Sequence, residues 1–286
     1  MWSSSAAAAS LPFLYPPLAS PLAAAVSAAA LAAAASMGLS ELRGDNLAYS
    51  KFWHAAVGGD RGRQRRGGGG GDGGALRLLP SRGAMVVAYG PALVAALASF
   101  AVPGAVDGRR AIVLSAALAL HFLKRILESF FIHRYSGCVP LATALLVGSG
   151  YLFNTVAMIH VQHLSHNLPN PSIDLLYPGM LVFAVGITGN FYHHCLLSRL
   201  RGGGDNDKQY KIPRGGLFEL VICPHYLFEI IVFFGFAMIS QTVFGLAVAL
   251  GTAAYLTGRS CATRRWYASK FEEFPATIKA LVPYVF

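Results

Sequence analysis

The stretch "HFLKRILESFF", residues 121–131, places two basic side chains and one acidic side chain inside a long apolar run. This run begins near residue 111 and has the length of a membrane-spanning helix. A charged side chain near the bilayer centre costs several kcal/mol, so membrane helices rarely keep one without a partner or a function. Glu128 lies one helical turn after Lys124, so the two side chains can pair. We therefore predict a membrane helix in which Lys124, Arg125 and Glu128 serve the chemistry of the protein.

The composition supports a membrane protein. The 286 residues are 55% hydrophobic and only 13% charged. A soluble domain carries about 25% charged residues. The shortfall is concentrated in apolar blocks, and the mean hydropathy of the chain is +0.50. This composition predicts an all-α, polytopic membrane protein and argues against a soluble enzyme with a large core.

Seven apolar blocks predict about seven transmembrane helices. They cover residues 11–36, 84–103, 111–131, 139–160, 175–198, 217–239 and 241–257. The first block is rich in Ala and could also be a cleaved signal peptide, but no basic region precedes it, so we expect a membrane helix. After this block, residues 58–82 include a Gly- and Arg-rich segment, which predicts a loop.

The basic residues indicate the orientation of the chain in the membrane. The net charge is +10, and the basic residues lie between apolar blocks, so no nucleic-acid partner is expected. With seven spans, the loop at 58–82, the segment at 199–214 and the tail from residue 258 fall on one side. All three are basic, which predicts a luminal N-terminus and a cytosolic C-terminus. Arg109 and Arg110 lie on the opposite side and weaken this pattern slightly.

Histidine clusters raise the alternative of a metal enzyme. His160, His163 and His166 form HxxHxxH, and His193 is followed directly by His194. Membrane desaturases and hydroxylases bind two irons through HxxxH and HxxHH motifs, and neither spacing occurs here. The four cysteines form no CxxC pair either. No metal site is predicted.

Polar residues inside the later blocks indicate a binding site. Asn190 and His194 lie on a predicted helix that leads out of the membrane. His225, Tyr226 and Glu229 fall within about two helical turns of one another. Phe and Ile surround Glu229 in the sequence, so an ionised carboxylate at this position needs a partner.

Arginines beside these spans suggest an anion-binding pocket that opens to the cytosol. Arg201 and Arg259 are among them, and the guanidinium fork suits the bidentate binding of a phosphate. No GxGxxG follows a predicted strand, and the chain has no βαβ pattern. A dinucleotide would therefore be held between membrane helices.

Two motifs carry a family resemblance. "YKIPRGGLFELVICPHYLFE" at 210–229 and "KFEEFPATIKALVPYVF" at 270–286 resemble the steroid 5α-reductase family, over a region from about Lys124 to Phe286. The resemblance implies a multi-span reductase of the endoplasmic reticulum that uses NADPH to reduce a carbon–carbon double bond conjugated to a carbonyl. It also implies a division into N-terminal membrane helices, residues 1–110, and a C-terminal catalytic domain, residues 111–286.

The resemblance further implies a cofactor site. Positions that match the NADPH-binding residue types of the family are Asn190, Arg201, Tyr210, Glu229, Arg259 and Tyr267. His194 stands where steroid reductases have Asp, and His225 stands where they have Asn. The catalytic Glu and Tyr of steroid reductases align with Tyr89 and Phe122, so the steroid-type acid is missing.

The residues nearest the chemistry look like the branch of very-long-chain trans-2-enoyl-CoA reductases. Lys124, Arg125 and Glu128 form "KRxxE", and "CPHY" supplies Tyr226 as the proton donor. "YKIPRGGLF" instead looks like the steroid branch. We expect a trans-2-enoyl-CoA substrate and a fatty acid elongation complex as partner, with a Δ4-3-oxosteroid substrate as the alternative. A membrane scaffold without activity is the remaining alternative.

Overall fold

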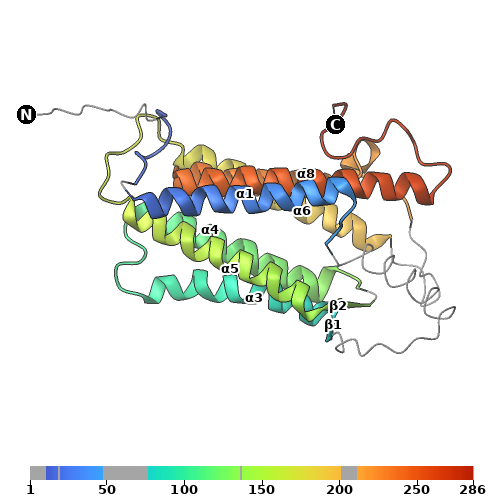
Figure 1. The fold of residues 1–286 in the computed structure, drawn as a ribbon, viewed down its shortest axis with the longest axis horizontal. Coiled ribbons are helices and arrows are strands. Elements are labelled where there is room, and N and C mark those ends of the chain that lie inside the picture. The colour runs from blue at the N-terminus through green and yellow to red at the C-terminus, as the bar shows by residue number, and fades with distance from the viewer. Residues whose placement is uncertain (1–10, 19, 48–76, 136, 201–210, 286) are drawn as a thin grey trace, which may run out of the picture.

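The computed structural model describes residues 11–18, 20–47, 77–135, 137–200 and 211–285, which form a helical bundle in which successive described helices alternate in direction (Figure 1). Seven α-helices occur in these described ranges: α1 (Pro21–Arg43), α3 (Ser81–Ala98), α4 (Gly108–Leu127), α5 (Leu141–Leu164), α6 (Leu176–Arg199), α7 (Pro224–Ser240) and α8 (Val243–Lys270). Two short strands, β1 (Leu78–Pro80) and β2 (Cys138–Pro140), pair in an antiparallel manner before α3 and α5. The all-α prediction is confirmed.

Each predicted apolar block contains one helix, but two helices begin later than predicted. α1 begins at Pro21, because the prolines before it do not favour a helix and Ser20 caps the first turn by accepting a hydrogen bond from the Ala23 amide at 3.3 Å. α7 begins at Pro224, after a 3₁₀ turn over Gly216–Glu219. Proline suits the first helical position because its missing N–H would be unpaired there.

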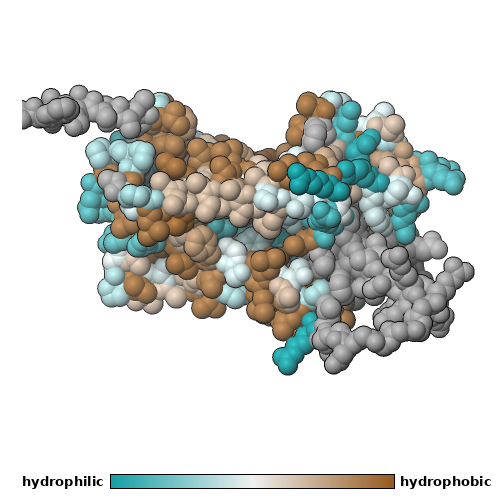
Figure 2. All heavy atoms as spheres, in the orientation of Figure 1, coloured by the Kyte–Doolittle hydropathy of each residue, from teal (hydrophilic) through white to brown (hydrophobic). Residues whose placement is uncertain are grey.

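The helices form a multi-pass membrane protein. Four of those described are long and apolar enough to cross a bilayer: α1, α3 with the turn that extends it to Ala101, α5 and α6. α7 is apolar but has 17 residues, and α4 and α8 carry buried charges. The surface along the helices is largely hydrophobic (Figure 2), as expected for side chains that face lipid.

Glycines let neighbouring helices pack closely. A Cβ atom at Gly235 of α7 would lie 2.7 Å from the Cα of Phe183 on α6. A Cβ atom at Gly38 of α1 would lie 2.5 Å from the carbonyl oxygen of Ala254 on α8. Small residues at such contacts are typical of membrane helices, which associate through close packing. α1 is therefore an integral part of the bundle, packed along α8 (Figure 1).

The two ends of the bundle differ in charge. α1, α4, α6 and α8 all terminate at one end (Figure 1), which we call the basic end because Arg43, Arg199 and Lys270 lie there. The predicted grouping of basic segments on one side agrees with this arrangement. Residues 58–76 of the predicted loop and residues 201–210 lie outside the described residues.

At the opposite end, the two arginines that weakened the charge pattern have local partners. Arg110 donates to a carboxylate oxygen of Asp174 and to the carbonyl oxygen of Ile239, both at 2.7 Å, and Arg109 donates to the Tyr177 hydroxyl at 2.8 Å. The Leu176 amide and Arg110 together lower the pKa of Asp174. These arginines therefore connect the ends of neighbouring helices.

Residues 11–18 are held at this same opposite end. Gln241, in the turn between α7 and α8, has a left-handed backbone with φ 51° and is fully buried. Its side-chain amide donates to the carbonyl oxygens of Phe13 at 2.6 Å and Ile173 at 2.8 Å. Its own carbonyl oxygen accepts from the Tyr15 amide at 2.8 Å. One side chain thus joins the N-terminal segment, the α5–α6 connection and the α7–α8 turn.

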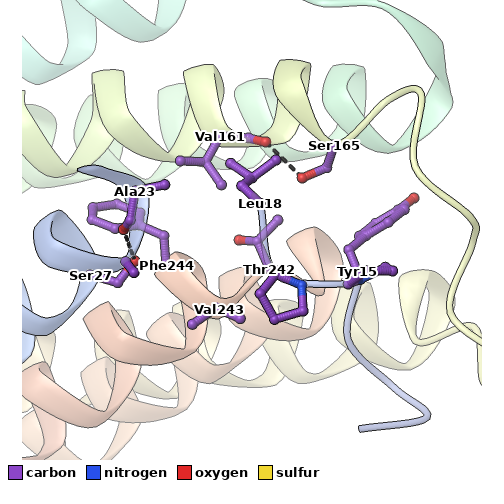
Figure 3. Close-up of a pocket in the computed structure, with 12 residues that line it drawn as sticks. Tyr15, Leu18, Ala23, Ser27, Val161, Ser165, Thr242, Val243 and Phe244 are labelled. Atoms are coloured by element: carbon purple, nitrogen blue, oxygen red, sulfur yellow. Dashed lines mark hydrogen bonds between the residues drawn. The ribbon is translucent and has the colours of Figure 1, made fainter. Parts of the chain in front are cut away.

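A pocket of about 70 Å³ lies beside this segment (Figure 3). It is lined by Tyr15, Pro16, Pro17, Leu18, Ala23, Ala24, Ser27, Val161, Ser165, Thr242, Val243 and Phe244. None of the predicted site residues is among them, so this pocket is separate from the predicted site.

Candidate active site

The last turn of α4 forms the centre of a charged network near the basic end. The Lys124 ammonium lies 3.0 Å from Oε1 of Glu128, and Nη1 of Arg125 lies 3.3 Å from Oε2. The predicted ion pair is therefore present, and Glu128 is only 1% exposed. A π-helical turn begins at Glu128 and runs to Ile132. Such turns inside helices are frequent at functional sites.

α6 supplies two predicted residues to this network. Nδ1 of His194 lies 3.0 Å from Oε1 of Glu128. Asn190 accepts a hydrogen bond from Lys124 and donates one from its own amide to the carbonyl oxygen of His225 at 2.8 Å. α4, α6 and the start of α7 are therefore joined through side chains that the sequence analysis had selected.

Tyr89 of α3 also belongs to the network, although the sequence analysis named it only in the comparison with steroid reductases. The Tyr89 hydroxyl accepts a hydrogen bond from Nη2 of Arg125 at 2.7 Å, and the guanidinium carbon lies 4.9 Å from the centre of the tyrosine ring. Tyr89 is buried. The network therefore includes a phenol in direct contact with a cation.

Glu229 has a partner that the sequence analysis missed. Its Oε1 lies 3.5 Å from Nε2 of His121 on α4. The His121 ring stands edge-on to the rings of Phe122, Phe233 and Phe236. Within the part of the chain that the structure describes, Oε2 of Glu229 and Nδ1 of His121 are buried without a hydrogen-bond partner. His121 precedes Lys124 by one helical turn, and this spacing could have revealed it.

Tyr226 and Tyr267 lie in a second, more aromatic group. Tyr226 is partly buried and packs against Ile222 and Ile278, and its ring centre lies 4.2 Å from that of His225. The Tyr267 hydroxyl donates to the carbonyl oxygen of Lys211 at 3.5 Å. His225 contacts both sets, because its carbonyl oxygen accepts a hydrogen bond from Asn190 and its ring lies against that of Tyr226.

Arg259 of α8 forms an ion pair with the first helix. Its Nη1 atom is 2.7 Å from Oε1 of Glu41 on α1, and both side chains are 1% exposed. The predicted cofactor residue is therefore in an ion pair between α1 and α8. Arg201 and Tyr210, also predicted to bind the cofactor, lie outside the described residues.

The "PRGG" stretch, residues 213–216, forms a tight turn. Gly215 and Gly216 have φ angles of 86° and 55°, which favour glycine. The Gly215 amide donates to Glu219 at 2.8 Å, and this bond together with Arg214 lowers the pKa of the Glu219 carboxyl. The Leu217 amide donates to Nε2 of His193 at 3.2 Å, so His193 has a structural role.

One group of side chains has the geometry of a metal site. Ligand atoms of Glu128, His133 and His194 lie within 4.8 Å of one another. Lys124 and Arg125, however, already contact the same carboxylate. A divalent cation would be placed beside two positive charges, which is electrostatically unfavourable. We therefore keep the prediction that the site has no metal.

The fold and the network define a polytopic α-helical membrane protein with a buried, charge-balanced site near one end. Comparison with known proteins gives its family. Residues 138–286 match the family model of 3-oxo-5-alpha-steroid 4-dehydrogenase, and the chain belongs to this family, the steroid 5α-reductases and their relatives. The resemblance inferred from the two motifs is confirmed.

The individual relatives are named as reductases of different substrates. A 3-oxo-5-alpha-steroid 4-dehydrogenase 1 of Macaca fascicularis is 34% identical over 214 residues, covering 73% of this chain and 80% of the relative. A very-long-chain enoyl-CoA reductase of Dictyostelium discoideum is 34% identical over 170 residues, or 58% and 55% of the two chains. A steroid 5-alpha-reductase DET2 of Gossypium hirsutum is 43% identical over 109 residues, or 38% and 42%. The protein is thus an oxidoreductase that acts on CH–CH groups.

Proposed function

We propose that this protein uses NADPH to reduce a trans-2-enoyl-CoA in very-long-chain fatty acid elongation. The observation that carries the proposal is the buried set of Lys124, Arg125 and Glu128, joined to Asn190 and His194. These residues resemble the enoyl-CoA reductase branch. Reduction of a Δ4-3-oxosteroid is the second candidate, favoured by the steroid reductases among the relatives.

The buried polar atoms fit a nicotinamide cofactor. Oε2 of Glu229 has no partner among the described residues, and a carboxylate oxygen in such a position suits a ligand that carries N–H or O–H donors. The residues that would hold NADPH are Asn190, His194, Arg201, Tyr210, His225, Glu229, Arg259 and Tyr267. When bound, NADPH supplies the hydride for the reduction. Arginine near its extra phosphate should give preference over NADH, and titration of the solubilised protein with both nucleotides tests this.

The network provides the electrostatics that the reaction needs. Addition of hydride to the β-carbon places negative charge on the thioester oxygen as an enolate. Lys124 and Arg125 stabilise that charge, and Glu128 keeps both cations in place. Tyr226 gives its hydroxyl proton to the α-carbon, which completes the saturated product, and then regains a proton from solvent.

The setting of the enzyme follows from the same proposal. It lies in the endoplasmic reticulum membrane with the basic end in the cytosol, where acyl-CoA and NADPH are found, and with a luminal N-terminus. Residues 111–286 act as the catalytic domain, residues 1–110 as N-terminal helices, and a fatty acid elongation complex is the partner. Protease protection of tagged microsomes tests the orientation, because a shielded tag at the C-terminus contradicts it.

A direct comparison of substrates tests the proposed activity. Purified protein is supplied with NADPH and either a long-chain trans-2-enoyl-CoA or a Δ4-3-oxosteroid. NADPH oxidation is followed by absorbance, and the saturated products are identified by mass spectrometry. Turnover of the thioester alone supports the proposal, and turnover of the steroid alone replaces it with the second candidate.

A further inference from the structure

Arg259 is the largest fully buried side chain among the described residues, and its charge is balanced by a residue far away in the sequence. Nη1 lies 2.7 Å from Oε1 of Glu41, which belongs to the last turn of α1, 218 residues earlier. Nη1 also lies 3.4 Å from the carbonyl oxygen of Leu47, just beyond that helix. The C-terminal end of α1 and the residues after it thus supply two acceptors to this guanidinium nitrogen.

Glu41 is itself held in place. The Leu47 amide donates to its Oε1 at 3.0 Å, and Nη2 of Arg265 donates to its carbonyl oxygen at 3.0 Å. One turn earlier, Gly38 makes the close backbone contact with Gly258, the residue directly before Arg259. The ion pair therefore lies beside the close approach of the two helix backbones.

A buried guanidinium without a counter-ion is strongly unfavourable, so removing Glu41 would drive Arg259 toward water or another partner. We propose that Glu41 is a positioning residue, which holds Arg259 in the orientation needed to bind a phosphate of the cofactor. This inference rests on the proposed function, in which Arg259 binds NADPH. A guanidinium has five N–H donors, so a carboxylate and a phosphate can share it.

The inference gives the first helix a part in cofactor binding. Glu41 lies outside residues 138–286, which match the family model. α1 would thus act on the cofactor site through a single carboxylate, without touching the cofactor itself.

Substitutions of Glu41 in the full-length protein test this role. Glu41→Gln should raise the KM for NADPH by about tenfold and change kcat by less than about twofold, because binding is impaired and the network on α4 is not. Glu41→Asp keeps the charge and should raise KM by only about threefold. Ser27→Ala, which alters another buried polar residue of α1, is the matched control and should leave KM unchanged. All measurements are made well below each variant's Tm.

The outcomes separate the inference from the proposed function. A lower Tm with unchanged KM in Glu41→Gln would show a purely structural role, and a lower KM would show that Glu41 competes with the phosphate. Either result overturns the inference. Arg259→Gln is measured in parallel: if it leaves NADPH affinity unchanged, the proposed cofactor role of Arg259 is wrong as well. If Glu41→Gln does not accumulate, Glu41→Asp carries the test, and an unchanged KM there overturns it.

Discussion

The Tyr89 hydroxyl lies 2.7 Å from Nη2 of Arg125, and this bond joins α3 to the charged residues of α4. Arg125 also contacts Glu128 and His194, so the phenol is one end of a chain of polar groups that reaches Asn190.

Tyr89→Phe should therefore affect both stability and rate. Loss of the hydroxyl leaves one donor of Arg125 without its acceptor, which should cost about 1–3 kcal/mol of unfolding free energy. Turnover should fall modestly if Tyr89 only orients Arg125. Thermal unfolding in detergent and NADPH oxidation measure the two effects. A loss of turnover much larger than that of Tyr226→Phe would instead make Tyr89 the proton donor.

Tyr226→Phe tests the proposed donor directly. A general acid contributes about 10²–10⁴-fold, so kcat should fall by a factor in this range. The phenylalanine ring preserves packing against Ile222 and Ile278, so NADPH binding and Tm should change little. Single-turnover kinetics with saturating NADPH provide the measurement. Wild-type turnover in this variant is incompatible with the assignment.

Removing the Lys124 cation and removing the Glu128 anion should have different effects on the protein. Lys124→Met removes the proposed enolate-stabilising charge but leaves Glu128 paired with Arg125, so the fold should survive while turnover falls. Glu128→Leu leaves two buried cations without their carboxylate and should lose about 3–5 kcal/mol of stability. Comparing Tm and kcat of the two variants separates the effects. Equal loss of stability in both would mean that the pair acts only in folding.

The opposite end of the bundle predicts a small dependence of stability on pH. The Leu176 amide at 2.9 Å and Arg110 at 2.7 Å lower the pKa of Asp174 below its ordinary value of 3.8. A depressed pKa contributes stability above the unfolded value, and this contribution is lost as pH falls through the folded value. Asp174→Asn should therefore lower Tm near pH 7, with the difference from wild type shrinking toward about pH 3. The side chain is 61% exposed, so the effect should be small, and a difference that grows in acid would contradict it.

The sequence was most informative where the signal is local. Apolar runs located every helix among the described residues, and the four-residue spacing of Lys124 and Glu128 predicted their ion pair because both lie on one helix face. The pairs Tyr89–Arg125 and Glu41–Arg259 join different helices, 36 and 218 residues apart, and no local pattern connects them. His121 precedes Lys124 by one helical turn, which indicated a shared helix face. Its position within an apolar block is equally typical of a packing residue. The late start of α1 depends on prolines and a cap that hydrophobicity alone does not reveal.

The hydrogen bonds of Gln241 have a consequence for local unfolding. The same amide group donates to Phe13 and to Ile173, and the backbone of Gln241 binds Tyr15. If the α7–α8 turn opens, the N-terminal segment and the α5–α6 connection lose these bonds at the same moment. Local unfolding at this end of the bundle is therefore cooperative. Slowly exchanging amides in all three segments should show the same opening rate in hydrogen exchange.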